Sequence, residues 1–181
     1  MTLHFCGYFP KKATPRPEGW DLPGVVEIAS ISDCIAKGPE DWIKSWKFNE
    51  LGFFDEVALA ESVVPSADRS QFDLYAYSFL DERFVDGLVE QWKPPELAGS
   101  GPESDFEPLG FDVVSKAVTD FFECSPLSCN GGAKTFRANA HCLFETLDDA
   151  VAAAGTFSKG GWEPGPFYVA QVLRRRRSAG R

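Results

Sequence analysis

Three of the five cysteines and one of the two histidines fall within residues 124–142. A cysteine becomes a nucleophile when a base within hydrogen-bond reach takes its proton and a carboxylate orients that base. Cys124 or Cys129 as the nucleophile, His141 as the base and a carboxylate such as Glu123 or Asp112 complete that inventory. The candidate catalytic residues of the chain are Cys124, Cys129, His141 and Glu123.

The turn that follows Cys129 suits the binding of an anionic oxygen. Its residues Asn130, Gly131 and Gly132 favour a tight turn that presents backbone N–H groups, so Asn130 and Gly131 are candidate binding residues. The chain contains no local signature of a cysteine hydrolase, no Gly-x-Ser-x-Gly elbow and no phosphate-binding glycine loop. Whether the protein is an enzyme stays open at this point.

The same residues also suggest a metal site. Structural zinc needs four ligands, commonly in pairs with short spacers, and the four residues between Cys124 and Cys129 fit the long end of that range. Adjacent residues of a strand point to opposite faces, so only one of His141 and Cys142 could join such a site. The metal alternative is therefore Cys124, Cys129, His141 and Cys6. Because there is no Cys-x-x-Cys pair, the sequence favours buried, packing cysteines and predicts no cofactor, with zinc as the alternative.

Charge and tryptophan content indicate a different kind of function. The net charge is −9, and the five arginines of residues 174–181 leave −14 for residues 1–173. A region this acidic repels nucleic acid and anionic membranes, and it favours binding to a basic protein partner. Trp92 and Trp162 lie beside Pro and Gly turns, where aromatic side chains can anchor a partner.

This composition is similar to that of small acidic proteins that neutralise bacterial toxins. We therefore expect a non-catalytic interaction protein that binds a basic partner through an acidic, Trp-containing surface. The alternative is a cysteine-dependent or zinc-stabilised site around Cys124, Cys129 and His141. Residues 174–181 are expected to form a disordered basic tail, and its arginines at 174–177 could bind nucleic acid or the acidic body itself.

Length and hydrophobic content predict one folded domain. The chain has 181 residues, of which 44% are hydrophobic and 14% aromatic, enough for a substantial core. No apolar run approaches the ~18–20 residues of a membrane span, and residues 1–10 lack the features of a secretory signal. Irregularly spaced cysteines suit a reducing compartment, so we expect a cytoplasmic protein.

The pattern of elements predicts an α+β fold. Residues 72–80 read as a central strand, Asp86-Gly87 as a hairpin turn, residues 147–158 as a helix capped by Thr146, and residues 167–173 as a last strand. Residues 121–124 and 135–144 read as a further strand pair, and residues 93–105 as a loop. We expect a single domain over residues 1–173, with a mixed, mostly antiparallel sheet and about three to four short helices.

Overall fold

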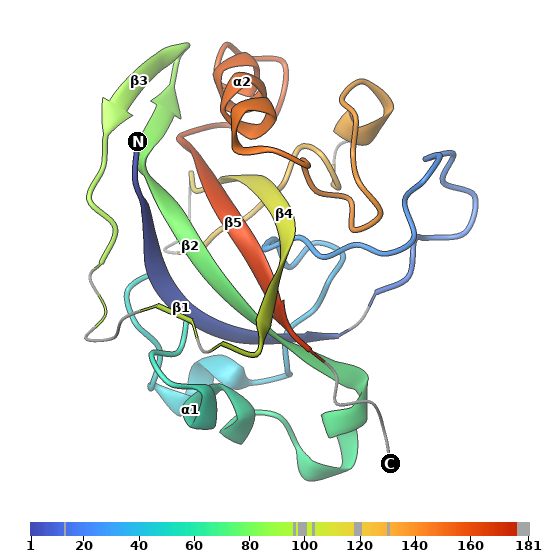
Figure 1. Cartoon of the computed structure of the whole chain (residues 1–181), viewed down its shortest axis with the longest axis vertical. Coiled ribbons are helices and arrows are strands. Elements are labelled where there is room, and N and C mark those ends of the chain that lie inside the picture. The colour runs from blue at the N-terminus through green and yellow to red at the C-terminus, as the bar shows by residue number, and fades with distance from the viewer. Residues whose placement is uncertain are drawn as a thin grey trace.

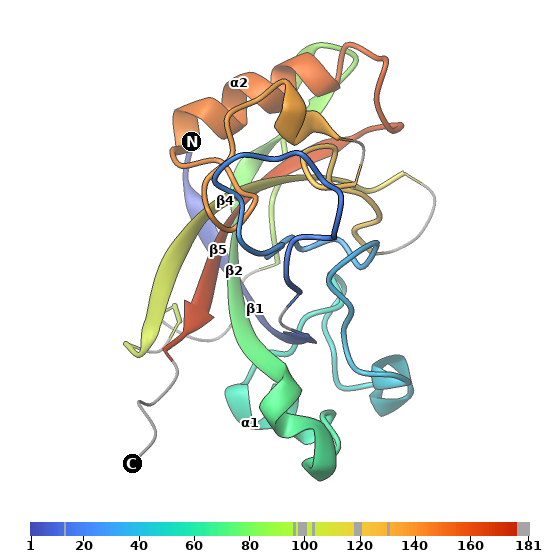
Figure 2. The same cartoon turned by 90° about the vertical axis from the view of Figure 1, so that its right-hand side faces the viewer.

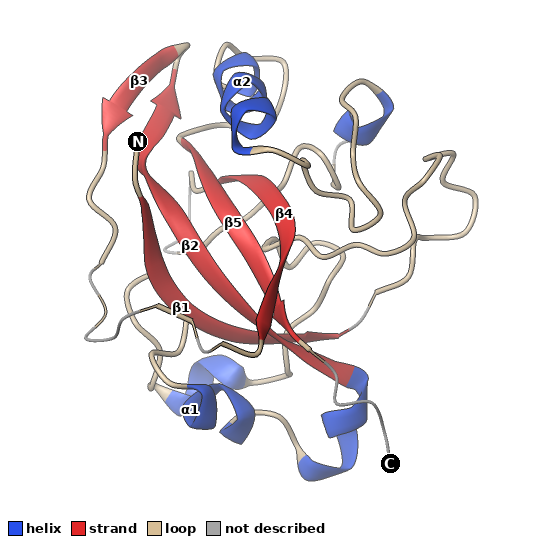
Figure 3. Cartoon of the chain, viewed as in Figure 1, coloured by secondary structure: helices blue, strands red, loops and turns tan. Residues whose placement is uncertain are grey.

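One antiparallel sheet of five strands organises the molecule (Figures 1 and 3). This computed structural model describes residues 1–12, 14–95, 97, 101–102, 104–117, 121–129 and 131–176. The strands are β1 (Leu3–Lys12), β2 (Phe72–Val85), β3 (Leu88–Gln91), β4 (Phe106–Ser115) and β5 (Phe167–Arg175). Their order is β1-β2-β5-β4, with β3 paired to β2, and every pair is antiparallel.

Two short α-helices lie at opposite ends of the sheet in Figure 1, α1 (Val57–Ser62) beside β1 and α2 (Leu147–Phe157) against β4 and β5. The described residues also form three 3-10 helices, Trp42–Ser45, Ser66–Gln71 and Gly132–Lys134. The rest of the chain runs in long loops along the sheet (Figure 2). The predicted α+β class, with one sheet and a few short helices, is confirmed.

The structure confirms the strand, the hairpin turn and the helix that the sequence patterns predicted most strongly. Strand β2 is central and buried along most of its length, and it continues past the predicted end to Val85. Val85 pairs with Leu88 across the Asp86-Gly87 turn, as the hairpin prediction requires. Helix α2 begins at the predicted cap, where Thr146 accepts a hydrogen bond from the Asp149 N–H.

Strand β5 separates two hydrophobic clusters. Tyr168, Ala170 and Val172 belong to one cluster, whereas Phe167 and Val169 belong to the other. This alternation follows from the two-residue period of a strand, whose successive side chains point to opposite faces. Because both faces are covered, the loops that pack on the sheet are held at fixed positions, and the candidate site is built from such loops.

The predicted strand pair at 121–124 and 135–144 is wrong. Each segment pairs with β4 at a single bridge, Cys124 with Ser115 and Phe144 with Phe111. Between these bridges the backbone groups bond within compact turns or to residues 26–29, and Cys142 adopts a left-handed φ of 57°. The polar and Gly-rich residues of this region favour turns over a continuous ladder.

The first three arginines of the predicted basic tail are part of the fold. Arg174 and Arg175 belong to β5, and the backbone N–H of Arg176 donates to the carbonyl of Asp105 at 2.9 Å. Arg175 Nε lies 2.6 Å from Asp105 Oδ2, and its Nη1 lies 2.6 Å from Glu61 Oε1. These arginines therefore contact acidic groups of the protein's own body. Residues 177–181, and residues 96, 98–100 and 103 of the predicted loop at 93–105, lie outside the described residues.

Candidate functional site

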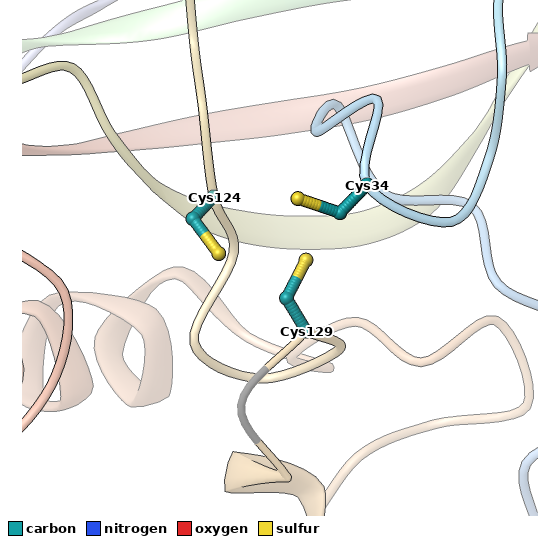
Figure 4. Close-up of side chains that lie close together, drawn as sticks. All are labelled: Cys34, Cys124 and Cys129. Atoms are coloured by element: carbon teal, nitrogen blue, oxygen red, sulfur yellow. The ribbon is translucent and has the colours of Figure 1, made fainter. Parts of the chain in front are cut away.

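Three cysteine sulfurs meet at one place in the fold. The Sγ atoms of Cys34, Cys124 and Cys129 all lie within 4.8 Å of one another, and all three cysteines are free thiols. Figure 4 shows their sulfurs directed into a common space, with Cys34 on a different loop from the other two. Cys34 is exposed, Cys129 is half-buried and Cys124 is buried, so this thiol cluster opens to solvent on the Cys34 side.

Strand β4 and one tight turn position two of the three cysteines. The N–H of Ser115 donates to the carbonyl of Cys124 at 2.8 Å, and the carbonyl of Ser115 accepts from the Glu123 N–H at 2.9 Å. The Cys129 N–H then donates to the carbonyl of Ser125 at 2.7 Å. This bond closes the turn that returns Cys129 to the neighbourhood of Cys124.

A buried lysine holds the loop that carries Cys34. Lys11 of β1 is fully covered, and its ammonium donates to the carbonyls of Ser32 at 3.0 Å and Ala36 at 3.1 Å. It also lies 2.8 Å from a carboxylate oxygen of Asp33. Burial lowers the pKa of Lys11, while the Asp33 carboxylate opposes that shift. The loop around Cys34 is therefore fixed by a cation from the sheet beneath it.

A buried carboxylate connects the Cys34 loop with the Cys124 turn. Asp112 Oδ2 accepts from Ser30 Oγ at 2.8 Å and from the Ile31 N–H at 2.9 Å. Its Oδ1 accepts from Ser125 Oγ at 2.7 Å and from the Val113 N–H at 2.9 Å. Burial raises the pKa of Asp112 to about 6, although these hydrogen bonds oppose the shift. One side chain thus ties together both backbone segments of the thiol cluster.

The sulfurs differ in acidity because of their mutual interaction. Interaction with the Cys124 thiol lowers the pKa of Cys129, against the effect of burial. The same interaction, together with burial, raises the pKa of Cys124. The hydroxyl oxygens of Ser32 and Ser128 lie 3.5 Å and 3.6 Å from Cys129 Sγ. Cys129 is accordingly the sulfur of this pair that ionises first.

The predicted base, His141, lies in a different charged cluster. Its Nδ1 is 2.6 Å from Glu27 Oε1, and the same oxygen is 2.6 Å from Arg174 Nη1. The neighbouring Cys142 is fully buried in a hydrophobic cluster. Among the described residues, the structure groups Cys124 and Cys129 with Cys34 and not with His141.

Two other predicted residues have different roles from those expected. Glu123 contributes its backbone to the site, since its carbonyl accepts from Ser32 Oγ at 2.8 Å and Cys34 Sγ at 3.3 Å. Cys6, a member of the alternative zinc set, is buried in a hydrophobic cluster, where its Sγ donates to the carbonyl of His4 at 3.2 Å. The structure therefore does not bring Cys6 to the other cysteines of that set.

In the predicted binding turn, a backbone N–H group already donates a hydrogen bond within the protein. Asn130 lies outside the described residues, and Gly131 adopts a φ of 73° just before the 3-10 helix Gly132–Lys134. The N–H of Gly132 donates to the carbonyl of Pro126 at 2.9 Å. That donor is therefore engaged in holding the turn.

The tryptophans predicted as anchors pack within the molecule. Trp92 makes edge contacts with Phe79 and Tyr168. Trp162 is only partly buried and lies edge-on to Phe157 at a centroid distance of 4.9 Å. The most exposed tryptophan is Trp46, with 82% of its surface accessible.

The member of the thiol cluster that sequence reasoning missed is Cys34. It is far from the other two cysteines in the sequence and has no cysteine or histidine close to it. One local signal exists, because both Cys34 and Cys129 end polar turns that contain serine. That similarity does not show that the two turns lie close together. Their proximity comes from the packing of both turns on β4.

The cluster has the donors and the spacing to hold a metal ion. Thiolates are the preferred ligands of soft and borderline ions such as Cu(I) and Zn(II). Zn–S bonds of about 2.3 Å in a tetrahedron place the sulfurs about 3.8 Å apart, so small rotations of these side chains would suffice. Within the described residues, no histidine, cysteine or acidic residue completes the group as a fourth ligand at the same spacing.

Comparisons of the chain with protein-family models, curated proteins and solved structures find no match. In the described part of the chain, none of the helices has the length and apolar character needed to cross a membrane. The case for function therefore depends on the geometry of the thiol cluster and on the surface of the molecule.

Proposed function

We propose that this protein binds a thiophilic metal ion through Cys34, Cys124 and Cys129. The observation that carries the proposal is the convergence of the three Sγ atoms, all within 4.8 Å of one another. Three thiolates leave a fourth position of a tetrahedral ion for water or an added ligand, the arrangement of catalytic and exchangeable zinc sites. Because Cys34 is exposed, that position would be open to solvent.

Preorganisation supports the proposal. A site that must be assembled on binding loses affinity to the ordering of its segments, so ligands held in place by their surroundings bind more tightly. Here the Cys34 loop is fixed by Lys11 and Asp112, and Asp112 also bonds to the segment of Cys124 through Ser125. These bonds are internal to the protein and hold the sulfurs together by themselves.

Electrostatics also favours a cation at this place. Each ligand must lose its proton to bind, and three thiolates close together need a positive charge between them. The polar contacts around Cys129 stabilise a negative sulfur, which also interacts electrostatically with the buried ammonium of Lys11. A divalent ion would leave one net negative charge, which Lys11 partly offsets.

A reducing compartment suits this function, and we propose that the protein acts in the cytoplasm. Thiols this close together oxidise readily in an oxidising compartment, where they would no longer be available as ligands. All five cysteines are free in the structure.

Cobalt(II) titration of the purified protein tests metal binding. We expect one ion per chain and an intense sulfur-to-metal charge-transfer band in the near ultraviolet, because thiolates bind directly. Cys34→Ser, Cys124→Ser and Cys129→Ser should each reduce the affinity by at least about 100-fold. Cys6→Ala should leave it unchanged. A missing band, or a band insensitive to the three serine variants, contradicts the proposal.

A second candidate is the binding of a basic protein partner, favoured by the exposure of Trp46. Its side chain is 82% exposed next to Ile43, which is 44% exposed, on a chain whose body carries a charge of −14. Exposed aromatic side chains on an acidic protein combine an anchor with electrostatic steering. We expect a basic partner to be retained at low salt, released at high salt, and lost with Trp46→Ala. Retention by Trp46→Ala at every salt concentration rules out this surface.

A further inference from the structure

Two of the three proposed ligands are poised to react with each other. We infer that a peroxide oxidant joins Cys124 and Cys129 in a disulfide and thereby releases the metal ion. The inference rests on the proposed metal-binding function, since it concerns the regulation of that same site. It assigns Cys124 and Cys129 as the oxidised pair and Cys34 as a ligand that stays reduced.

The position of the third thiol selects this pair among the three cysteines. The Sγ atoms of Cys124 and Cys129 lie within 4.8 Å of each other, and the two cysteines lie at the two ends of one turn. The Cys34 thiol is instead directed to the carbonyl of Glu123 at 3.3 Å. A disulfide needs the sulfurs to close to about 2.05 Å, which demands that the two side chains rotate toward each other on a nearby backbone.

The backbone between the two cysteines is short and already turned. The Cys129 N–H bonds to the carbonyl of Ser125 at 2.7 Å, so the chain reverses between the two cysteines. Joining Cys124 to Cys129 closes a small loop within one segment. Joining Cys34 to either would cross-link two loops that Lys11 and Asp112 hold in place, and it would displace the Cys34 thiol from its carbonyl partner.

Solvent access distinguishes the thiol cluster from the other cysteines. Cys129 is half-buried and lies beside the exposed Cys34, whereas Cys6 and Cys142 have no exposed surface. A small oxidant such as hydrogen peroxide can therefore reach the Cys129 sulfur in the folded protein. Thiols of this kind, accessible and next to a second thiol, are typical of redox-sensitive sites.

The chemistry balances with hydrogen peroxide as the oxidant. The Cys129 thiolate attacks one peroxide oxygen, the O–O bond breaks, and hydroxide leaves, giving a sulfenic acid. The Cys124 sulfur then attacks the Cys129 sulfur, the S–O bond breaks, and water leaves as the disulfide forms. Two thiols and one peroxide thus give one disulfide and two waters, and a thiol reductant reverses the change.

Loss of the metal ion follows from the loss of two ligands. A disulfide sulfur is a far poorer ligand than a thiolate, so an oxidised site would offer Cys34 alone. We expect zinc affinity to fall by at least about 100-fold on oxidation and to return on reduction.

The experiment uses the full chain loaded with zinc. Hydrogen peroxide is added, zinc release is followed with a chromophoric chelator, and the unreduced protein is digested with trypsin. Cleavage at Lys116 and Lys134 leaves Cys124 and Cys129 in one peptide and Cys34 in another. The expected product is the peptide 117–134 lighter by two hydrogen atoms, formed as zinc is released and reversed by dithiothreitol.

Matched variants separate the inference from the proposed function. Cys34→Ser, treated without zinc, should still form the disulfide, because Cys34 takes no part in it, whereas Cys124→Ser should not. A cross-link between the Cys34 peptide and the 117–134 peptide, or zinc retained after peroxide, overturns the inference while metal binding stands. A wild-type protein that never binds zinc overturns the proposed function, even if the disulfide forms.

Discussion

The five cysteines fall into two groups with opposite surroundings. Cys6 and Cys142 are fully buried, one in each hydrophobic cluster, and burial raises the pKa of each to about 12. Cys34, Cys124 and Cys129 meet at a place that opens to solvent and is lined by polar groups. Cys142 follows a histidine in the sequence and is shielded from solvent, whereas the isolated Cys34 belongs to the site. The polar groups that the fold gathers around a sulfur decide its chemistry, and its sequence neighbours do not.

Thiol alkylation at pH 7 should divide the cysteines most sharply. We expect Cys34 and Cys129 to be alkylated by iodoacetamide at least about 1000-fold faster than Cys6 and Cys142, because the latter react only after unfolding. Peptide mass spectrometry over time measures each rate. Added zinc should slow the alkylation of Cys34 and Cys129 and leave the other two rates unchanged. Comparable rates at Cys6 and Cys34 would remove the distinction.

Replacement of Asp112 should have the next largest effect. The four donors around its carboxylate all need an acceptor, and in Asp112→Asn the amide NH₂ must face a backbone N–H on one side or the other. We expect the free energy of unfolding to fall by about 2–4 kcal/mol in urea titrations, together with weaker cobalt binding. Asp21→Asn, at an exposed position, is the control and should change neither quantity. An unchanged affinity in Asp112→Asn argues against its role in holding the site.

Serine substitutions at Cys142 and Cys34 should have opposite consequences. Cys142→Ser places a hydroxyl in a fully buried apolar position and should cost about 1–3 kcal/mol of stability without changing metal affinity. Cys34→Ser lies at the surface and should change stability by no more than about 0.5 kcal/mol while reducing cobalt affinity. Urea unfolding and cobalt titration of both variants give the two quantities. If both variants lose stability and affinity together, the two groups are not independent.

The sequence predicted the sheet better than it predicted the site. Strands β2 and β5 and helix α2 carry continuous local patterns, such as aromatic runs and the Thr146 cap, which depend on neighbours in the sequence. Cys124 and Cys129 were recognised because they share one turn. Cys34 was not, since its place beside them depends on Asp112 bonding to residues from two loops. Contacts of that kind are decided by tertiary packing, which no local period encodes.

The pH dependence of stability should show the smallest difference between the two regions. Burial raises the pKa of Asp112 to about 6, compared with about 3.9 in an unfolded chain. A raised pKa means that the folded state favours the protonated form, so this contribution is complete below about pH 4 and is lost as pH rises through 6. The free energy of unfolding of the wild type should therefore fall, relative to that of Asp112→Asn, by about 1 kcal/mol between pH 5 and pH 7.5. Cys6 and Cys142 stay protonated throughout this range, so Cys142→Ser should keep the wild-type pH profile. Urea titrations at both pH values, made without metal, measure the difference. If the wild-type profile is parallel to that of Asp112→Asn, the carboxylate is already ionised at pH 5. Its four hydrogen bonds would then lower its pKa by more than burial raises it.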